Sequence, residues 1–490
     1  MTVITPMRTL VVGLTLCVVS VMACNGQSPS SPSANAAPAA TTPLPAVVLG
    51  RPTDRSVAVS LSPGASAEVY LEWAEAGAAY ADRTPTAQVG SQVPTTVTLD
   101  RLRANTAYSY RVRYRAAGES AFRVGPDRTF RTARTPGTSF TFAIQADPHL
   151  DDNSSTAVYG QTLQNILNDR PDFLVDLGDT SMSEKCVIAG STLCAPPTPV
   201  SEVNVAARTR LARTWFENVA HSVPLFLVLG NHDGEAGWTG SLNTPSLDLW
   251  AVTARKALFA NPEPDGFYSG SADAVPGIGL RQNYYAFEWG DALFVMLDPY
   301  TYTSRKPGSD LWSWTLGTTQ YQWLARTLST SRARYKFVFT HHLLGGNGSE
   351  TRGGAAFAPY YEWGGRNADG SWGFDRQRPG WPAPIHQLMV DARVTAWFHG
   401  HDHLYAREER DGIVYQEVPQ PSLARYDTPD PAAGYGYVGS VGSNIFPSSG
   451  YLRVTVAPTS VRVEYVRSVA PGDETATRRN GAIVHEYSLQ

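Results

Sequence analysis

Short apolar runs alternate with amphipathic segments along the chain from Ser139 onward. The continuous apolar character of the runs is typical of strands buried on both faces, and the segments between them have helical spacing. This alternation predicts an α/β fold whose chemistry lies in loops beyond the carboxyl ends of the strands. The expected strands are Phe140–Ile144, Phe173–Leu177, Leu225–Leu229, Leu293–Leu297, Phe337–Thr340 and Val394–Phe398, and the expected helices are Thr156–Asn168, Glu202–Val219 and Thr318–Leu328.

Residues 47–135 have a different pattern, in which polar and apolar side chains alternate with the period of a strand. Examples are Val57–Leu61, Val69–Trp73 and Thr96–Leu99, with no helical stretch between them. Short strands at regular spacing predict a small all-β sandwich. The run Leu102–Val112 resembles fibronectin type III domains, and we expect a structural module rather than a ligand-binding one.

Residues 138–490 are expected to form one further domain. Near its end, Tyr451–Val456 and Val461–Tyr465 alternate on either side of a turn, which predicts a closing β-hairpin. Two insertions rich in Gly and Trp, residues 234–283 and 345–384, are interpreted as long loops.

The N-terminus has the features of an export signal over residues 1–24. Arg8 precedes the apolar run Leu10–Ala23, which is short for a membrane span. Cys24 follows in a context that resembles a bacterial lipoprotein processing site, so lipidation is expected, with simple secretion as the alternative. The Ser-, Pro- and Ala-rich residues 25–46 predict a disordered tether. We therefore expect a protein exported to the cell envelope or the medium, which meets a membrane only through a lipid anchor.

Charge and cysteine content narrow the possible partners. The formal net charge is −4 and no long basic run occurs, so nucleic-acid binding is not expected. Cys186 and Cys194 lie close together in a polar loop, where an oxidising compartment favours a local disulfide. Neither has a His or Cys partner at zinc-ligand spacing.

Five polar motifs occur in chain order, each directly after an apolar run. They hold six of the ten histidines of the chain, which random placement would not produce. The motifs are Asp147-Pro148-His149, Gly178-Asp179, Gly230-Asn231-His232-Asp233, Thr340-His341-His342 and Gly400-His401-Asp402-His403.

Carboxylate, amide and imidazole side chains in this combination suit two neighbouring divalent or trivalent metal ions. An aspartate can bridge such a pair, because each carboxylate oxygen can serve one ion. Two ions roughly 3.5–4 Å apart can activate a water and hold the oxygens of a phosphate. The donors suit zinc, iron or manganese and exclude a metal selected by thiolates.

The motifs together resemble the calcineurin-like metallophosphoesterases, the superfamily that includes purple acid phosphatases. The resemblance spans about Ser139 to Ser468 and implies an α+β four-layer fold, with two facing mixed β-sheets flanked by helices. It implies a metal-bound hydroxide as nucleophile, His232 as acid or phosphoryl stabiliser, and Asp233 orienting the His232 ring. The implied ligands are Asp147, His149, Asp179 and His403 for one ion and Asp179, Asn231, His341 and His401 for the other, with Asp179 bridging.

The sandwich and the runs Gln320–Leu324 and His403–Arg407 also resemble the larger purple acid phosphatases. Two positions depart from that group. Met182 stands where those enzymes carry a tyrosine, and His149 stands where they have no histidine. Without a tyrosinate ligand, the charge-transfer colour should be absent, and neither an iron–zinc pair nor a strongly acidic optimum is implied.

The remaining polar and aromatic residues leave alternatives open. His342 either contacts substrate or is a supporting or solvent-facing histidine, and Asp402 is a supporting or surface carboxylate. Between the last two motifs, Tyr360–Gly365 with Trp372 and Trp381 forms either a substrate wall or ordinary loop packing. Four further histidines are interpreted as structural, packing or surface residues, namely His221, His386, His399 and His485.

The leading hypothesis is hydrolysis of a small-molecule phosphate ester outside the cytoplasm. An acid-phosphatase-like monoesterase is favoured over a phosphodiesterase of the same superfamily. A surface binding or adhesion protein with a vestigial catalytic domain is a hypothesis from another class, although all seven ligand positions are filled. A zincin-type peptidase is disfavoured, because no His-Glu-x-x-His sequence occurs.

Overall fold

The computed structural model describes residues 43–91, 93–151, 154–185, 200–240, 246–426 and 432–490. The expected export signal with Cys24, almost all of the expected tether, and the pair Cys186 and Cys194 lie outside these ranges. Within the described ranges, no helix combines the length and the apolar character that crossing a bilayer requires.

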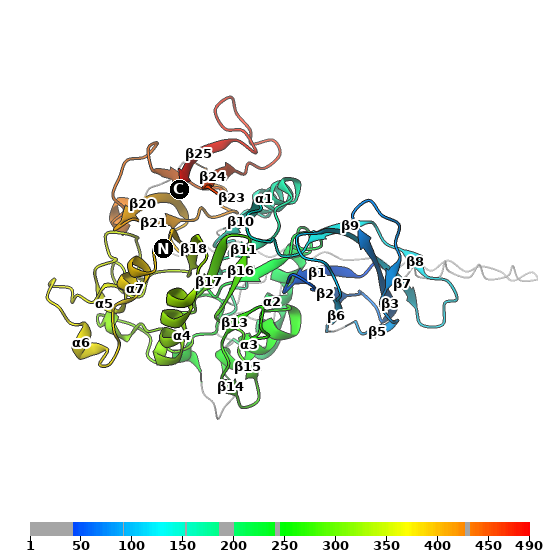
Figure 1. The fold of residues 1–490 in the computed structure, drawn as a ribbon, viewed down its shortest axis with the longest axis horizontal. Coiled ribbons are helices and arrows are strands. Elements are labelled where there is room, and N and C mark those ends of the chain that lie inside the picture. Colours follow the sequence, from blue (N-terminus) through cyan, green and yellow to red (C-terminus); the bar gives the residue numbers. More distant parts are fainter. Residues whose placement is uncertain (1–42, 92, 152–153, 186–199, 241–245, 427–431) are drawn as a thin grey trace, which may run out of the picture. The chain divides into compact units, whose positions relative to one another are not determined.

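A six-stranded antiparallel sheet and three antiparallel strands at the end of a larger sheet form the predicted sandwich (Figure 1). Their strands are β1 (Ala46–Gly50), β2 (Val57–Ser62), β3 (Ala67–Glu75), β4 (Asp82–Arg83), β5 (Ala87–Val89), β6 (Thr95–Leu99), β7 (Ala107–Ala116), β8 (Arg123–Val124) and β9 (Arg128–Arg131). β1, β2 and β6 pair in one sheet, and the long pair β3 and β7 forms the centre of the other. The alternating apolar side chains meet between the sheets, where Val59, Leu71 and Tyr110 are fully buried.

Two larger mixed sheets carry the rest of the chain. Their strands are β10 (Phe140–Gln145), β11 (Leu174–Asp176), β12 (Leu225–Leu227), β13 (Ser269–Gly270), β16 (Tyr285–Trp289), β17 (Ala292–Met296), β18 (Tyr335–Phe339), β19 (Ala396–His399), β20 (Leu404–Arg410), β21 (Ile413–Glu417), β22 (Ile445–Pro447), β23 (Gly450–Ala457), β24 (Ser460–Arg467) and β25 (Ile483–Leu489). The first sheet has the order β25-β24-β23-β10-β11-β12 and continues into β1-β2-β6. The second has the order β13-β16-β17-β18-β19-β21-β20-β22, and β14 (Ala274–Val275) and β15 (Gly279–Leu280) form a separate hairpin.

Helices cover the outer face of each large sheet. They are α1 (Thr156–Asp169), α2 (Glu202–Phe216), α3 (Leu247–Leu258), α4 (Gly317–Thr330), α5 (Tyr361–Gly364), α6 (Phe374–Gln377), α7 (Ile385–Asp391) and α8 (Ala432–Tyr435). Leu163 of α1 packs on the first sheet, and Leu324 of α4 packs on the second. Between the sheets, the rings of Phe142 on β10 and Phe294 on β17 lie 5.0 Å apart. This layered arrangement confirms the predicted fold class.

The sandwich and the following region share backbone hydrogen bonds. β1 runs parallel to β12, with Gly50 opposite Leu225. The Tyr110 hydroxyl donates to the carbonyl of His221 at 2.6 Å, across the same junction. Residues 42–490 accordingly form one compact unit. One continuous sheet therefore contains strands from both sides of the predicted division at residues 135–138.

The predicted strands from 140 onward are all present, and the C-terminal hairpin forms from β23 and β24, with β25 as a third strand. The insertion at 234–283 contains a feature that the sequence analysis missed. We interpreted it as a loop, but it includes the twelve-residue helix α3. Ala251, Val252 and Leu258 of α3 are buried, and the helix packs against α2.

Candidate metal centre

The five motifs meet because they follow strands of both large sheets. Asp147, Asp179 and Asn231 come after the parallel strands β10, β11 and β12. His341 follows β18 and His401 follows β19, which are also parallel to each other. Parallel strands end at the same edge of a sheet, so each sheet brings its motifs to one edge.

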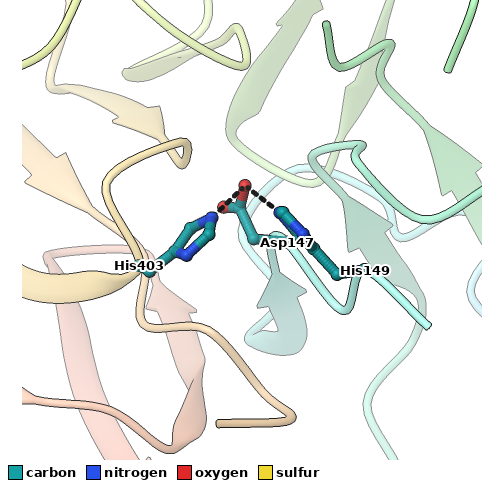
Figure 2. Close-up of side chains that lie close together, drawn as sticks. All are labelled: Asp147, His149 and His403. Atoms are coloured by element: carbon teal, nitrogen blue, oxygen red, sulfur yellow. Dashed lines mark ion pairs between the residues drawn. The ribbon is translucent and has the colours of Figure 1, made fainter. Parts of the chain in front are cut away.

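Asp147, His149 and His403 form the first ligand group. Oδ1 of Asp147 lies 3.8 Å from Nε2 of His149 and 3.5 Å from Nε2 of His403. Figure 2 shows the two rings on either side of that carboxylate. Oδ2 of Asp147 accepts a hydrogen bond from the backbone N–H of His401 at 2.8 Å. Oδ1 is therefore the oxygen that remains for a metal ion.

Asp179, His341 and His401 form the second ligand group. Nε2 of His341 lies 3.1 Å from Oδ2 of Asp179 and 3.3 Å from Nδ1 of His401. The other ring nitrogens donate to backbone carbonyls, from His341 to Leu177 at 2.9 Å and from His401 to Glu350 at 2.6 Å. A carbonyl can only accept, so these bonds place a proton on the bonded nitrogen and turn the other nitrogen of each ring toward the centre.

The two groups lie next to each other and share their carboxylates. Oδ2 of Asp179 lies 3.8 Å from Nε2 of His149, and Oδ1 of Asp147 lies 3.6 Å from Nε2 of His341. Oδ1 of Asp179 accepts from the backbone N–H of His232 at 2.7 Å. We expected each oxygen of Asp179 to serve one ion, but Oδ2 is the oxygen that faces both groups. A bridging role for Asp179 stays a prediction.

Several buried ligand atoms have no hydrogen-bond partner in the part of the chain that the structure describes. Oδ1 of Asp147, Nε2 of His149 and Oδ1 of Asn231 lack hydrogen-bond partners among the described residues. Burial opposes protonation of His341, but Asp179 and Asp147 outweigh it and raise the pKa of His341 to about 10. Concentrated negative charge beside unpartnered oxygen and nitrogen atoms is what two cations would neutralise. The two groups therefore fit a binuclear metal centre.

The backbone of the motifs is held in an unusual conformation. φ is +61° at Asp147, +58° at His149, +55° at Asp179, +81° at His401 and +61° at His403. Residues other than glycine rarely adopt this left-handed region, and such strain clusters at functional sites. The loops thus adopt a strained backbone conformation at the residues that would bind the metals.

The motif glycines allow the loops to approach one another. A Cβ on Gly178 would lie 2.2 Å from the backbone nitrogen of Gly230, and one on Gly400 would lie 2.5 Å from Oδ2 of Asp147. Both distances are far below contact, so any other residue at these positions would push the ligand loops apart.

His232 lies beside the first group, with its ring 5.7 Å from that of His149. Its Nδ1 forms an ion pair with Oε1 of Glu184, which leaves Nε2 as the nitrogen that can exchange a proton with a ligand. Burial opposes protonation of His232, but Asp179 and Glu184 outweigh it and raise its pKa.

Among the described residues, Asp233 forms no hydrogen bond with the His232 ring, and its role in orienting that ring stays a prediction. The carboxylate of Asp233 accepts from the backbone N–H groups of Gly230 at 2.8 Å, and of Asp179 and Ser181 at 3.0 Å each. It ties the second and third motif loops together, and Glu184 contacts the ring. In the sequence, Glu184 is only an acidic residue in the loop after Gly178-Asp179, and nothing there indicates its contact with His232.

The residues left open by the sequence have defined surroundings. His342 is buried, and its Nδ1 donates to the carbonyl of Leu343 at 2.5 Å. Asp402 is also buried, and it accepts from the backbone N–H of Gly353 and the hydroxyl of Tyr437 at 2.7 Å each. Asp402 is therefore a supporting carboxylate rather than a surface one.

The aromatic stretch between the last two motifs packs rather than forming a substrate wall. Trp363 is fully buried, and Trp381 stacks on Tyr321 at 3.7 Å. Trp372 is exposed. Met182 is buried at the position of the missing tyrosine and offers no oxygen ligand.

The outlying histidines have partners elsewhere. His399 contacts Glu417 at 2.6 Å, His386 contacts Asp411 at 2.8 Å, and Nδ1 of His485 lies 2.8 Å from the hydroxyl of Tyr405. His221 contacts the hydroxyl of Ser222 at 2.8 Å.

Comparison with known proteins decides the family. A family model described as calcineurin-like phosphoesterase matches residues 140–405, more than half of the chain. The chain belongs to this family. As a calcineurin-like phosphoesterase it is a hydrolase that acts on phosphate esters, and the two ligand groups lie within or at the ends of the matched region.

Solved structures of low sequence identity share the fold of this phosphoesterase. A structure titled "Structure of PhoD" matches with a TM-score of 0.60 at 17% identity, covering 91% of this chain and 90% of that one. The purple acid phosphatase PPD1 from yellow lupin (Lupinus luteus) seeds matches with a TM-score of 0.55 at 13% identity, covering 91% and 74%. A search of curated proteins gave no match.

Proposed function

We propose that this phosphoesterase is an exported binuclear metal-dependent enzyme that hydrolyses phosphate monoesters in preference to diesters. The observation that carries the proposal is the pair of adjacent ligand groups with unpartnered buried atoms. Two bound cations would supply an activated water and neutralise the charge of the phosphate. The N-terminal sequence supports export, and the purple acid phosphatase among the similar structures supports monoester hydrolysis.

The residues have distinct roles in this proposal. Asp147, His149 and His403 would hold one cation, Asn231, His341 and His401 would hold the other, and Asp179 would face both. His232 donates a proton from Nε2 to the departing alkoxide, while Glu184 at Nδ1 holds the ring in place and favours its protonated form. Asp233 keeps the loops of Asp179 and His232 together.

Metal analysis and an ester assay test the hydrolase. Protein lacking the residues before Cys24 would be analysed for bound metals and assayed with p-nitrophenyl phosphate and bis-p-nitrophenyl phosphate. About two metals per chain and faster turnover of the monoester are expected. Faster turnover of the diester would overturn the monoester preference, and an absence of both metal and turnover would favour the binding-protein hypothesis.

Export and lipidation need a separate experiment. The full chain and Cys24→Ala would be expressed in a bacterial host, and cell fractions would be compared. Wild type is expected in the membrane fraction outside the cytoplasm, and Cys24→Ala among the soluble exported proteins. Cytoplasmic wild-type protein would contradict export.

A further inference from the structure

A pocket of about 300 Å³ opens beside the second ligand group. On one side it is lined by Asn231, His232 and His401, and on the other by Trp238 and Trp314. Its volume is at the lower end of the range of about 300–1,000 Å³ that holds small organic ligands. It therefore suits one compact group better than a polymer.

The two tryptophans that line the pocket contact each other. Their rings lie 5.5 Å apart at an interplanar angle of 89°. Two perpendicular rings form a corner that can take the face of a planar ligand ring on one side and its edge on the other, the two arrangements that aromatic groups prefer.

Both tryptophans are held by backbone contacts. The N–H of Gly237, next to Trp238, donates to the carbonyl of Tyr300 at 3.0 Å. The carbonyl of Trp314 accepts from the guanidinium of Arg378 at 3.0 Å. A backbone held in this way limits the movement of the attached side chains, which lowers the ordering cost of binding a ligand.

The position of His232 assigns the pocket to one part of the substrate. Under the proposed function, His232 protonates the oxygen of the leaving alcohol, and an acid must lie within hydrogen-bond reach of that oxygen. His232 lines this pocket and lies on the same loop as Trp238. The leaving alcohol therefore occupies the space between His232 and the tryptophan corner.

We propose that this pocket selects phosphate esters whose leaving alcohol carries an aromatic ring, and that Trp238 determines this specificity. The inference rests on the proposed function, because it assigns a substrate class to the same site. Trp238 acts by binding the ring, so it should change the KM of such esters and leave the KM of purely aliphatic esters unaltered.

Benzyl phosphate and propyl phosphate test the inference, because their alcohols are both alkyl alcohols and leave with similar ease. The metal-loaded protein should have a kcat/KM about tenfold higher for benzyl phosphate, mainly through KM. Trp238→Ala should remove this preference and keep turnover of propyl phosphate, and Trp238→Phe should restore most of it. Trp372→Ala, which alters an exposed tryptophan outside the pocket, serves as the matched control.

Two results would overturn the inference. One is a wild-type protein with no preference for benzyl phosphate. The other is a Trp238→Ala variant, folded by its melting curve, that retains the preference or loses activity on both esters equally.

Failure of the hydrolase itself is distinguished by a binding measurement. If neither ester is cleaved, calorimetry with benzylphosphonate and propylphosphonate replaces the assay. Tighter binding of benzylphosphonate that Trp238→Ala abolishes would support the pocket while the hydrolase fails, and equal binding of the two would overturn the pocket as well.

Discussion

The sandwich and the motif loops differ in how they accommodate charged side chains. In the sandwich, Glu72 on β3 lies between Arg111 and Arg113 on β7, 2.7 and 2.8 Å from their Nε atoms. These side chains are partly exposed, and their charges compensate each other. In the motif loops, Asp147 and His149 are buried and keep ligand atoms without hydrogen-bond partners among the described residues.

This difference separates structural ion pairs from a binding site. A buried polar atom without a partner costs free energy, and a cluster of such atoms among metal-ligand side chains is explained by a ligand that completes it. A half-exposed ion pair such as that of Glu72 stabilises the fold slightly and needs no ligand.

The largest effect is expected at Asp179. Asp179→Ala removes the carboxylate that faces both ligand groups, so bound metal should be lost and kcat/KM should fall about a thousandfold or more. Elemental analysis and ester hydrolysis measure the two losses on the same preparation. The control is Asp100→Ala, whose side chain in the sandwich is 65% exposed and should matter for neither. Two metals and full turnover in Asp179→Ala would refute the assignment of this site.

Glu184→Gln should have the next largest effect. It keeps the shape of the side chain but removes the charge at Nδ1 of His232, so kcat should fall about 10- to 100-fold. Metal content should stay unchanged, because Glu184 belongs to neither ligand group. Asp233→Asn is the informative companion, since it weakens three backbone hydrogen bonds and should lower the melting temperature. If Asp233→Asn keeps the melting temperature of wild type but loses kcat, then Asp233 acts on the His232 ring as the sequence predicted.

Glu184 also shows where sequence reasoning stops. The strands were predictable, because apolar runs mark buried strands. The motifs that carry the seven predicted ligands follow these strands directly, so their convergence at the sheet edges could also be expected. The contact between Glu184 and His232 depends on how two loops fold over each other, and no local pattern encodes it. The pairing of Gly50 with Leu225 is equally non-local, which is why the continuous sheet across the predicted domain boundary was missed.

Asp176 is a third case, because it is buried near the motifs but has hydrogen-bond partners within the protein. Its oxygens accept from Gln145 and from Thr180 at 2.8 Å each. Burial raises the pKa of Asp176 to about 8, although these hydrogen bonds oppose the shift. The folded protein thus keeps a proton that the unfolded chain loses above about pH 4, and this group makes stability fall as pH rises toward 8.

The asparagine side chain of Asp176→Asn cannot ionise, so the variant should lack this fall of stability with rising pH. At pH 8 the variant should be more stable than wild type by several kcal/mol, and at pH 4 the two should be nearly equal. Urea unfolding of the chelated protein at both pH values measures this difference without a contribution from metal binding. A variant that is less stable than wild type at pH 8 would show that Asp176 acts as a charged group.

The smallest effect is expected at Glu72, in the other half of the comparison. Burial opposes ionisation of Glu72, but Arg113 and Arg111 outweigh it and lower its pKa. Its contribution to stability is therefore present at neutral pH and is lost as pH falls below its usual range. Glu72→Gln should lower the free energy of unfolding by about 1 kcal/mol at pH 7 and by less near pH 3, with metal content and turnover unchanged. A loss of activity in this variant would mean that the sandwich acts on the metal site through the shared sheet, and the two regions could then no longer be treated as independent.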